Sequence, residues 1–173
     1  MNKAVFLDRD GTVIRDHGYL DNEDDIELLD GAGDALQRLI RTGFKLILVT
    51  NQSGIGRGFF TSDVVEAQHR RLAELLTPWN VSFTSIEICP HAPDDDCDCR
   101  KPSPRLLLQA ARTHDIDLHQ SFMVGDKPSD VEAGRNSGCA ASIMIQGRAD
   151  TANADYIAKN LPDAVDYIVK IES

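Results

Sequence analysis

The stretch Lys3-Ala-Val-Phe-Leu-Asp8-Arg-Asp10-Gly11-Thr12 places two aspartates directly after a short apolar run. The apolar run, residues 4–7, predicts a fully buried strand. Residues two apart in an extended chain share a face, so Asp8 and Asp10 are predicted to point to the same side. Two carboxylates this close favour a cation between them. The stretch alone is also compatible with a strand that runs into an Asp-Gly turn with both acids solvated.

Further apolar runs alternate with segments of helical periodicity along the chain. The predicted strands after the first are 45–50, 85–89, 121–125 and 141–145, with a short edge strand at 155–157. The predicted helices are one capped by Asp30 and closed by Gly43, and then 62–76, 104–114, 129–136 and 162–171, with loops at 13–25 and 51–58. This alternation predicts a doubly wound, Rossmann-like α/β fold in which helices cover both faces of a mostly parallel sheet. We expect residues 1–173 to form a single domain.

The composition narrows the class of protein. The 173 residues are 42% hydrophobic and 27% charged, which is typical of a globular protein. A net charge of −10 disfavours binding to nucleic acid through bulk electrostatics. No apolar run reaches the roughly 20 residues of a membrane span, and the N-terminus lacks a signal-peptide pattern. We therefore expect a cytoplasmic monomer that binds neither nucleic acid nor membranes.

Polar side chains follow the predicted strands at matching positions. They are Asp8 and Asp10, Thr50 and Asn51, and Asp126, Lys127 and Asp130, while Arg100 and Lys101 lie in the loop after the third predicted strand. Because the carboxyl ends of parallel strands meet at one edge of a sheet, we expect these residues to converge on one crevice. A solvated loop residue is the simpler interpretation of each one alone, but not of the whole set.

Three carboxylates and a lysine suit phosphoryl transfer with Mg²⁺, which prefers oxygen ligands. An aspartate carboxylate can attack phosphorus directly and form an aspartyl phosphate. A carboxyl group two residues further on can protonate the leaving alkoxide and then deprotonate water. Thr50, backbone amides and Lys101 are candidates to hold the phosphoryl oxygens.

These residues resemble the four ordered motifs of the haloacid dehalogenase superfamily of phosphatases. The motifs are Asp8-x-Asp10-Gly11-Thr12, Thr50-Asn51, Lys101 and Gly125-Asp126-x-x-x-Asp130. The resemblance implies Asp8 as nucleophile and Asp10 as general acid and base, with Thr50, Arg100 and Lys101 completing the catalytic set. It implies Mg²⁺ bound by the Asp8 carboxylate, the Asp10 backbone carbonyl and Asp126, and a second-shell or structural Asp130. The spacing of the motifs leaves no room for a large cap domain.

The loop at 89–101 carries a separate cluster, Cys89, His91, Cys97 and Cys99. Three thiolates and one imidazole form a complete tetrahedral zinc set, and a closed set of this kind is structural. The loop contains proline and three consecutive aspartates, so a metal ion could supply the free energy that orders it. A redox thiol pair and chance clustering are the alternatives, and the pattern favours Zn²⁺ over both.

The zinc loop resembles two subfamilies, the heptose 1,7-bisphosphate 7-phosphatases and the histidinol-phosphatases. The segments 6–12, 16–19, 50–54 and 97–102 resemble the heptose type, although the gap between His91 and Cys97 is shorter than in many members. That resemblance implies a sugar bisphosphate substrate and a role in making nucleotide-activated heptose for lipopolysaccharide. It implies substrate contacts from Asp16, His17, Gly18, Tyr19, Thr50, Asn51, Gln52, Ser53, Arg100, Lys101 and Lys127.

Two alternatives to the heptose substrate remain open. One is a histidinol-phosphate phosphatase, whose cationic substrate favours acidic groups in the specificity loop over Arg100. The other is a non-catalytic, zinc-stabilised binding module, which is disfavoured because Asp8, Asp10 and Asp126 are all present. A nucleic-acid 3′-phosphatase is disfavoured by the acidic composition.

Overall fold

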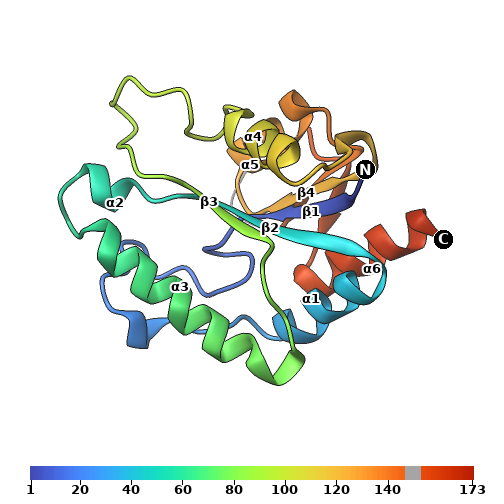
Figure 1. Cartoon of the computed structure of the whole chain (residues 1–173), viewed down its shortest axis with the longest axis horizontal. Helices are drawn as coiled ribbons and strands as arrows, with labels where there is room; N and C mark the ends of the chain where they lie inside the picture. The colour runs from blue at the N-terminus through green and yellow to red at the C-terminus, as the bar shows by residue number, and fades with distance from the viewer. Residues whose placement is uncertain (147–152) are drawn as a thin grey trace.

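A computed structural model describes residues 1–146 and 153–173 and contains a six-stranded, fully parallel sheet in the order β3-β2-β1-β4-β5-β6 (Figure 1). The strands are β1 (Lys3–Leu7), β2 (Phe44–Asn51), β3 (Ser85–Cys89), β4 (Phe122–Gly125), β5 (Ala141–Ile145) and β6 (Tyr156–Ala158). The central strand β1 pairs with β2 on one side and β4 on the other. The α/β prediction and the parallel sheet are confirmed.

Helices cover both faces of this sheet. They are α1 (Ala32–Arg41), α2 (Ser53–Gly56), α3 (Ser62–Leu76), α4 (Arg105–Thr113), α5 (Pro128–Ser137) and α6 (Leu161–Glu172), with short 3-10 turns η1 (Glu23–Asp25), η2 (Thr77–Trp79) and η3 (Leu118–Gln120). Side chains from α1, α3 and α6 join one hydrophobic core, whereas those from α4 and α5 join the core on the opposite face. The two layers of helices bury the apolar strands on both sides, as a parallel sheet requires.

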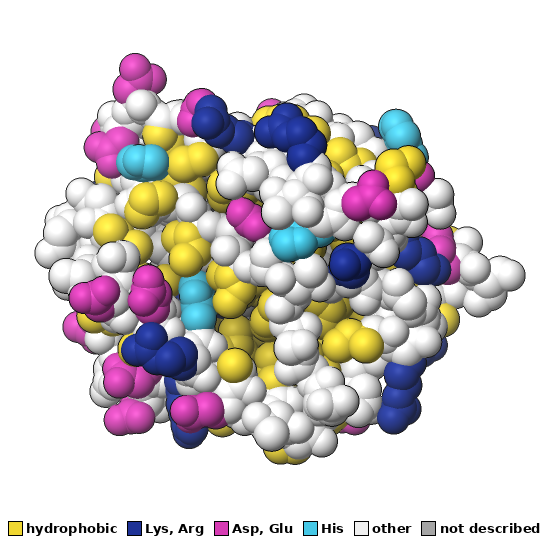
Figure 2. All heavy atoms as spheres, viewed as in Figure 1, with side chains coloured by type: hydrophobic (Ala, Val, Ile, Leu, Met, Phe, Trp, Pro, Cys, Tyr) yellow, Lys and Arg dark blue, Asp and Glu magenta, His cyan; other side chains and the backbone are white. Residues whose placement is uncertain are grey.

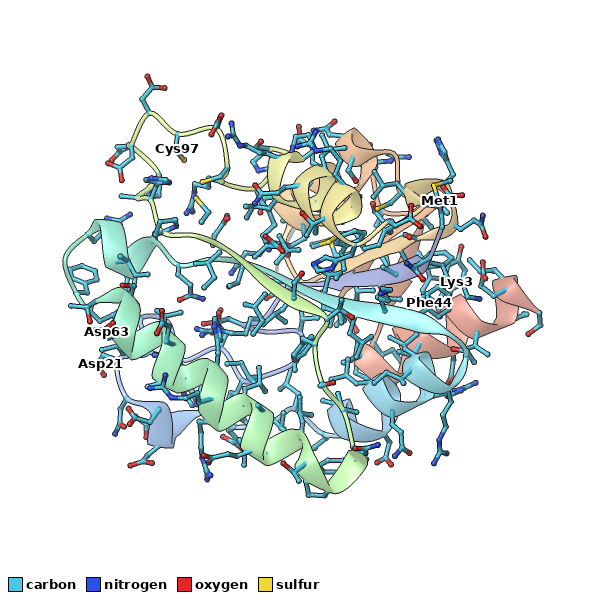
Figure 3. All side chains as sticks on the ribbon, viewed as in Figure 1. Met1, Lys3, Asp21, Phe44, Asp63 and Cys97 are labelled. Atoms are coloured by element: carbon cyan, nitrogen blue, oxygen red, sulfur yellow. The ribbon has the colours of Figure 1, made fainter. Side chains whose placement is uncertain are left out.

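Alternation along β1 explains how one strand serves two cores. Val5 and Leu7 belong to the core with α1, α3 and α6, and Phe6 belongs to the core with α4 and α5, all three being fully buried. At the amino end of β1, Lys3 lies over the ring of Phe44 at 4.3 Å and binds Glu172 of α6 at 2.9 Å (Figure 3). These contacts tie the amino end of β1 to β2 and α6, and its carboxyl end leads into the site described below.

Most predicted bounds lie within one residue of the observed ones, but two local predictions are wrong. Asp30 does not cap α1, because the N-cap is Gly31 in a left-handed conformation with φ of 74°. A Cβ at Gly31 would lie 2.8 Å from Cγ of Pro162, so a side chain there would press against α6. The segment predicted as a loop at 51–58 contains the short helix α2.

The carboxyl edge of the sheet carries only small elements among the described residues. The segment between β1 and α1 contains η1, and the segment between β2 and α3 contains α2. Neither segment forms a large cap domain, as the motif spacing predicted. Acidic and basic side chains are interspersed over the face shown in Figure 2. Within residues 1–146 and 153–173, every helix is too short or too polar to cross a bilayer.

Candidate active site

The site lies where the strand order reverses, at the carboxyl ends of β1 and β4. The chain proceeds from β1 to β2 on one side of the sheet and from β4 to β5 on the other. Such a switch point leaves a crevice at the strand ends, where α/β proteins bind ligands. Asp8 follows β1 and Asp126 follows β4, and the amide of Asp8 donates to the carbonyl of Val124 at 2.9 Å. The fold therefore brings the first and last predicted motifs together.

Lys101 joins the two central carboxylates of the site. Its Nζ lies 2.8 Å from Oδ1 of Asp8 and 2.7 Å from Oδ1 of Asp130, and it also donates to the carbonyl of Val49 at 2.7 Å. All three side chains are buried. Burial disfavours all three charged forms, but the ion pairs outweigh it at Lys101, whose pKa is raised, and at Asp8, whose pKa is lowered. At Asp130, burial and the neighbouring charge of Asp8 outweigh Lys101 and raise the pKa. Asp8 is therefore held as a carboxylate, the form that can act as a nucleophile.

Asp126 has the environment of a cation ligand. Its Oδ1 is buried and receives no hydrogen bond from the described residues. Burial and the neighbouring charge of Asp8 raise the pKa of Asp126 to about 7. Carboxylate oxygens of Asp8, Asp126 and Asp130 lie within 4.8 Å of one another. A bound Mg²⁺ would offset this repulsion and occupy the unpaired oxygen, so the residues present fit the ion.

Asp130 belongs to this cluster of carboxylates, but both of its oxygens have partners. Oδ1 pairs with Lys101, and Oδ2 accepts from the backbone amide of Lys127 at 3.0 Å, which caps the start of α5. These contacts tie Asp130 to Lys101 and to the start of α5.

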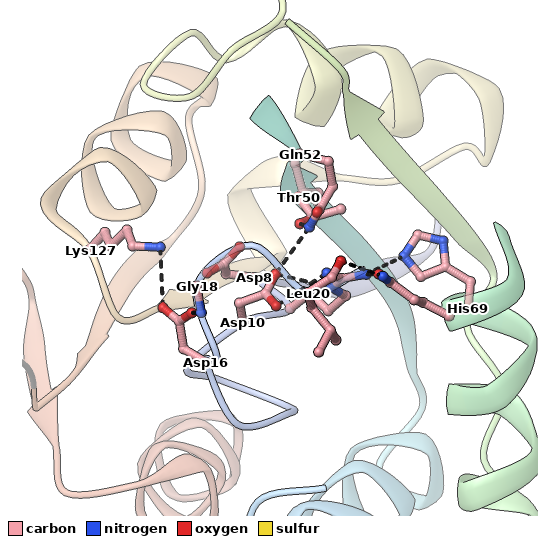
Figure 4. Close-up of polar contacts among 12 residues, drawn as sticks. Asp8, Asp10, Asp16, Gly18, Leu20, Thr50, Gln52, His69 and Lys127 are labelled. Atoms are coloured by element: carbon pink, nitrogen blue, oxygen red, sulfur yellow. Dashed lines mark hydrogen bonds and ion pairs between the residues drawn. The ribbon is translucent and has the colours of Figure 1, made fainter. Parts of the chain in front are cut away.

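Asp10 faces a different set of partners from Asp8. Its Oδ2 accepts hydrogen bonds from Nε of Arg9 and from Nε2 of Gln52, both at 3.0 Å (Figure 4). The same Gln52 nitrogen lies 2.8 Å from Oγ1 of Thr50, which is buried. The side chains after β1 and β2 thus form one hydrogen-bonded group at the edge of the sheet.

Asn51 orients the lysine loop through its amide group. Its Nδ2 donates to the carbonyl of Lys101 at 3.3 Å, and its Oδ1 accepts from the amide of Lys101 at 3.1 Å. This two-way pairing attaches the loop to the end of β2. The neighbouring Arg100 is half-buried, and its Nη1 is a buried donor without an acceptor among the described residues. An anionic group would satisfy that donor.

The segment 16–19 lies beside the start of α5. Asp16 accepts from the amide of Gly18 at 2.8 Å, and its Oδ2 lies 4.0 Å from Nζ of Lys127 (Figure 4). His17 and Tyr19 are exposed, and the ring of Tyr19 packs edge-on against Phe59 with centroids 4.7 Å apart. Ser53 begins α2. Of these predicted substrate residues, Asp16 lies near Lys127, whereas His17 and Tyr19 line a hollow together with Asp21, Asp24 and Glu27.

The cysteine cluster forms a compact group in the loop that carries Cys97 (Figure 3). The Sγ of Cys99 lies 3.0 Å from that of Cys89 and 3.2 Å from Nδ1 of His91, and Cys97 and Cys89 are separated by 3.9 Å. Burial and the neighbouring Cys99 thiol raise the pKa of Cys89 to about 12. Zinc–ligand bonds of about 2.0–2.3 Å place tetrahedral ligands at similar separations. The four side chains therefore fit Zn²⁺.

Comparisons with known proteins agree with this geometry. A sequence model of the HAD-hydrolase-like family matches residues 98–170. A Helicobacter pylori J99 protein, named D-glycero-beta-D-manno-heptose-1,7-bisphosphate 7-phosphatase, is 42% identical over 169 residues, covering 96% of this chain and 97% of its own. An Escherichia coli K12 protein of the same name is 39% identical over 184 residues, covering 96% and 94%. The chain belongs to the haloacid dehalogenase superfamily.

A solved structure of this superfamily has the same fold throughout. The D,D-heptose 1.7-bisphosphate phosphatase from B. bronchiseptica, complexed with magnesium and phosphate, superposes with a TM-score of 0.88 at 30% identity, covering 98% of this chain and 99% of that one.

Sequence reasoning missed part of the hydrogen-bonded group around Asp10 in this haloacid dehalogenase fold. Arg9 is 1% exposed, and it contacts Gln68 and His69 of α3. The position of Arg9 between two aspartates was a signal that it could pair with one of them. The two α3 residues carried no such signal, because α3 lies far from β1 in the sequence and its approach depends on the tertiary fold.

Proposed function

We propose that this protein is a phosphatase that removes the 7-phosphate of D-glycero-β-D-manno-heptose 1,7-bisphosphate with the help of Mg²⁺. The curated relatives that carry this name match the chain over nearly its whole length. The observation that carries the mechanism is the buried Asp8–Lys101–Asp130 group beside Asp126, whose Oδ1 receives no hydrogen bond from the part of the chain that the structure describes. The product would enter the synthesis of nucleotide-activated heptose for lipopolysaccharide.

Phosphoryl transfer to Asp8 is the first step of the proposed reaction. Lys101 occupies Oδ1 of Asp8, so Oδ2 forms the bond to phosphorus as the bond between phosphorus and the sugar oxygen breaks. A proton on Asp10 passes to the departing oxygen, and the sugar leaves as an alcohol. The positive charge of Lys101 offsets the charge that develops on the phosphoryl oxygens.

Hydrolysis of the aspartyl phosphate is the second step. A water oxygen bonds to phosphorus while Asp10 takes one of its protons, and the bond between phosphorus and Asp8 breaks. Inorganic phosphate leaves, and Asp8 and the protonated Asp10 are restored. Asp8, Asp126 and the backbone carbonyl of Asp10 would hold Mg²⁺, which supplies charge neutralisation for the phosphoryl group.

Specificity for a bisphosphate is proposed to come from cations around the crevice. Arg100 has a buried Nη1 without an acceptor among the described residues, and Lys127 is the N-cap of α5 and lies beside Asp16. Asp16, His17, Gly18, Tyr19, Thr50, Asn51, Gln52 and Ser53 would complete the substrate contacts with Lys101. An anionic distal group suits Arg100, whereas the cationic part of histidinol phosphate does not.

Zn²⁺ is proposed to be a structural ion bound by Cys89, His91, Cys97 and Cys99. Its support is the compact thiol and imidazole cluster directly before Arg100 and Lys101. The four cysteines are free thiols in the structure, which agrees with a reducing compartment such as the cytoplasm. We also propose that the protein is a single-domain monomer, and light scattering of the purified protein tests this oligomeric state.

Phosphate release from a panel of esters tests the proposed function. The panel contains both anomers of heptose 1,7-bisphosphate, fructose 1,6-bisphosphate and histidinol phosphate, each with and without Mg²⁺. We expect Mg²⁺-dependent turnover that favours the β anomer and is lost in Asp8→Asn. Turnover of histidinol phosphate alone would overturn the substrate, and turnover by Asp8→Asn with an unchanged far-UV spectrum would overturn the nucleophile.

A further inference from the structure

Arg9 makes a paired contact with the proposed general acid. Nε of Arg9 lies 3.0 Å from Oδ2 of Asp10, and Nη2 lies 3.2 Å from Oδ1 (Figure 4). A guanidinium that binds both oxygens of a carboxylate fixes the plane of that carboxylate as well as its position. Arg9 is 1% exposed, and a buried arginine without full pairing would strongly destabilise the fold. The Arg9–Asp10 contact is therefore a structural part of the buried interior.

Helix α3 holds the opposite side of the same guanidinium. Nη1 of Arg9 donates to Oε1 of Gln68 at 2.8 Å and lies 3.3 Å from Nε2 of His69. Gln68 is itself fixed, because its Nε2 donates to the carbonyl of Leu20 at 2.7 Å. Arginine has donors only, so the His69 nitrogen that faces it is the acceptor. The guanidinium is thus held between the end of β1 and one turn of α3.

The contacts also distinguish the two oxygens of Asp10. Oδ2 accepts from both Arg9 and Gln52, whereas among the described residues Oδ1 accepts from Arg9 alone. A carboxylate offers about four lone-pair directions, two on each oxygen, so Oδ1 keeps one that can take a proton. The two hydrogen bonds to Oδ2 occupy both of its lone-pair directions.

We propose that Arg9 is a positioning residue that holds Asp10 so that Oδ1 exchanges the catalytic proton, and that Gln68 and His69 hold Arg9 in place. This proposal rests on the proposed phosphatase function. The same oxygen must meet the departing sugar oxygen in the first step and a water in the second. A displacement of about 1 Å in such a group can cost about 10²-fold in rate, so the fork of Arg9 acts on both steps through Asp10.

Two phosphate esters separate this role from a merely structural one. An alkyl phosphate, the heptose bisphosphate, needs a proton on its leaving oxygen, whereas 4-nitrophenolate leaves from its phosphate ester as a stabilised anion. General acid catalysis contributes about 10²–10⁴-fold where a proton is needed. For Arg9→Met we expect kcat/KM to fall by about 30- to 100-fold with the sugar phosphate and by less than about 3-fold with 4-nitrophenyl phosphate.

Gln68→Leu provides a second variant that keeps both the Arg9 and the Asp10 side chains but removes the amide that holds Arg9. We expect a smaller loss of about 3- to 10-fold, again confined to the sugar phosphate, because Arg9 loses one of its two holders. Arg70→Met on the exposed side of α3 is the matched control and should leave both esters unchanged. Thermal unfolding of each variant reports whether it is folded, and Gln68→Leu carries the test if Arg9→Met does not fold.

Three results would overturn the role of Arg9: equal losses on both esters, an unchanged or higher kcat/KM, or a crystal structure of a variant with the Asp10 carboxylate unmoved. Failure of the proposed function is distinguishable from these. If the wild-type protein cleaves a different alkyl phosphate, the heptose assignment fails and the comparison is made with that ester. If it cleaves no ester, the crystal structures of Arg9→Met and Gln68→Leu decide the positioning claim alone.

Discussion

Gly11 shows how closely single residues determine the proposed cation site. A Cβ at this position would lie 2.2 Å from Oδ2 of Asp126, and φ of 80° is unfavourable for a residue with a side chain. We expect Gly11→Ala to displace the Asp126 carboxylate and raise the Mg²⁺ concentration for half-maximal activity by about tenfold or more, which corresponds to about 1.4 kcal/mol. A Mg²⁺ titration of phosphate release measures the effect.

Gly58 provides the control for that substitution. It has φ of 75°, but no atom lies within 4 Å of the Cβ it would gain. Gly58→Ala should therefore carry the same backbone strain, about 1–2 kcal/mol of stability, without changing the Mg²⁺ requirement. Equal Mg²⁺ requirements in both variants would show that Asp126 tolerates the extra atom.

At the scale of residues, sequence reasoning predicted which side chains converge but not how they pair. The convergence of Asp8, Lys101 and Asp126 followed from the shared edge of parallel strands. The position of Lys101 between Asp8 and Asp130 depends on the path of the loop after β3, which no local pattern encodes. The pairing of Asn51 with the Lys101 backbone was missed for the same reason.

At the scale of elements, α3 carries a histidine that couples stability to pH. Burial and the neighbouring Arg9 lower the pKa of His69 to about 4 from its ordinary value of 6.5. The unfolded chain therefore binds a proton below about pH 6.5 while the folded protein does not, so this residue reduces stability as pH falls from 6.5 to 4. The full effect is about 2–3 kcal/mol at pH 4 and below.

His69→Gln removes that linkage. We expect the free energy of unfolding, measured with urea between pH 7 and pH 4, to fall less steeply in the variant than in the wild-type protein. His119→Gln, at an exposed histidine in η3, should keep the wild-type slope. Parallel pH profiles for all three proteins would contradict the assignment of this linkage to His69.

The zinc loop makes a second prediction at this scale. Cys99→Ser should lower bound zinc to well below one ion per chain and reduce Tm, because three ligands bind zinc more weakly than four. It should also raise KM, since Arg100 directly follows Cys99. Zinc analysis, thermal unfolding and steady-state kinetics measure these effects. Cys139→Ser, outside the cluster, should retain zinc, and full zinc content in Cys99→Ser would mean that the ligand set is wrong.

Elements with strong periodicity were predictable to their ends, and the exceptions have physical causes. The helix 62–76 and the strand 85–89 have the observed bounds. The N-cap of α1 is Gly31 and not the predicted Asp30, because the chain turns at Gly31 in a left-handed conformation against Pro162. Helix α2 is a single turn of Ser53-Gly-Ile-Gly56, and two glycines in four residues favour a loop when only local propensity is considered.

At the scale of the whole molecule, the βα alternation predicted a mostly parallel, doubly wound sheet. It did not predict the order of the strands, which the structure gives as β3-β2-β1-β4-β5-β6. The helices on each face came from the same pattern, and the alternation of Val5, Phe6 and Leu7 between two cores agrees with it. The approach of α3 to the end of β1 could not be predicted from the sequence. The helix contacts Arg9 through side chains whose positions depend on tertiary packing and not on the hydrophobic periodicity of the helix.

Mg²⁺ should stabilise the whole fold if Asp8 and Asp126 bind it. A ligand at 100 times its Kd stabilises a protein by about 2.7 kcal/mol, which for a chain of this size raises Tm by roughly 5–10 °C. Differential scanning fluorimetry with MgCl₂ against NaCl at equal ionic strength measures the shift. Asp126→Asn should lose most of the Mg²⁺-induced rise in Tm. An equal rise in that variant would mean that other residues bind the ion.

Lys101 lies two residues after the last cysteine of the loop and is attached to β2 through Asn51. If Zn²⁺ orders that loop, a chelator that binds Zn²⁺ but not Mg²⁺ would inhibit this enzyme without competing with its sugar substrate or removing magnesium. Inhibition would develop as slowly as the loop releases its ion, and added sugar phosphate would not reverse it. A cell deprived of zinc would then lose a magnesium-dependent activity.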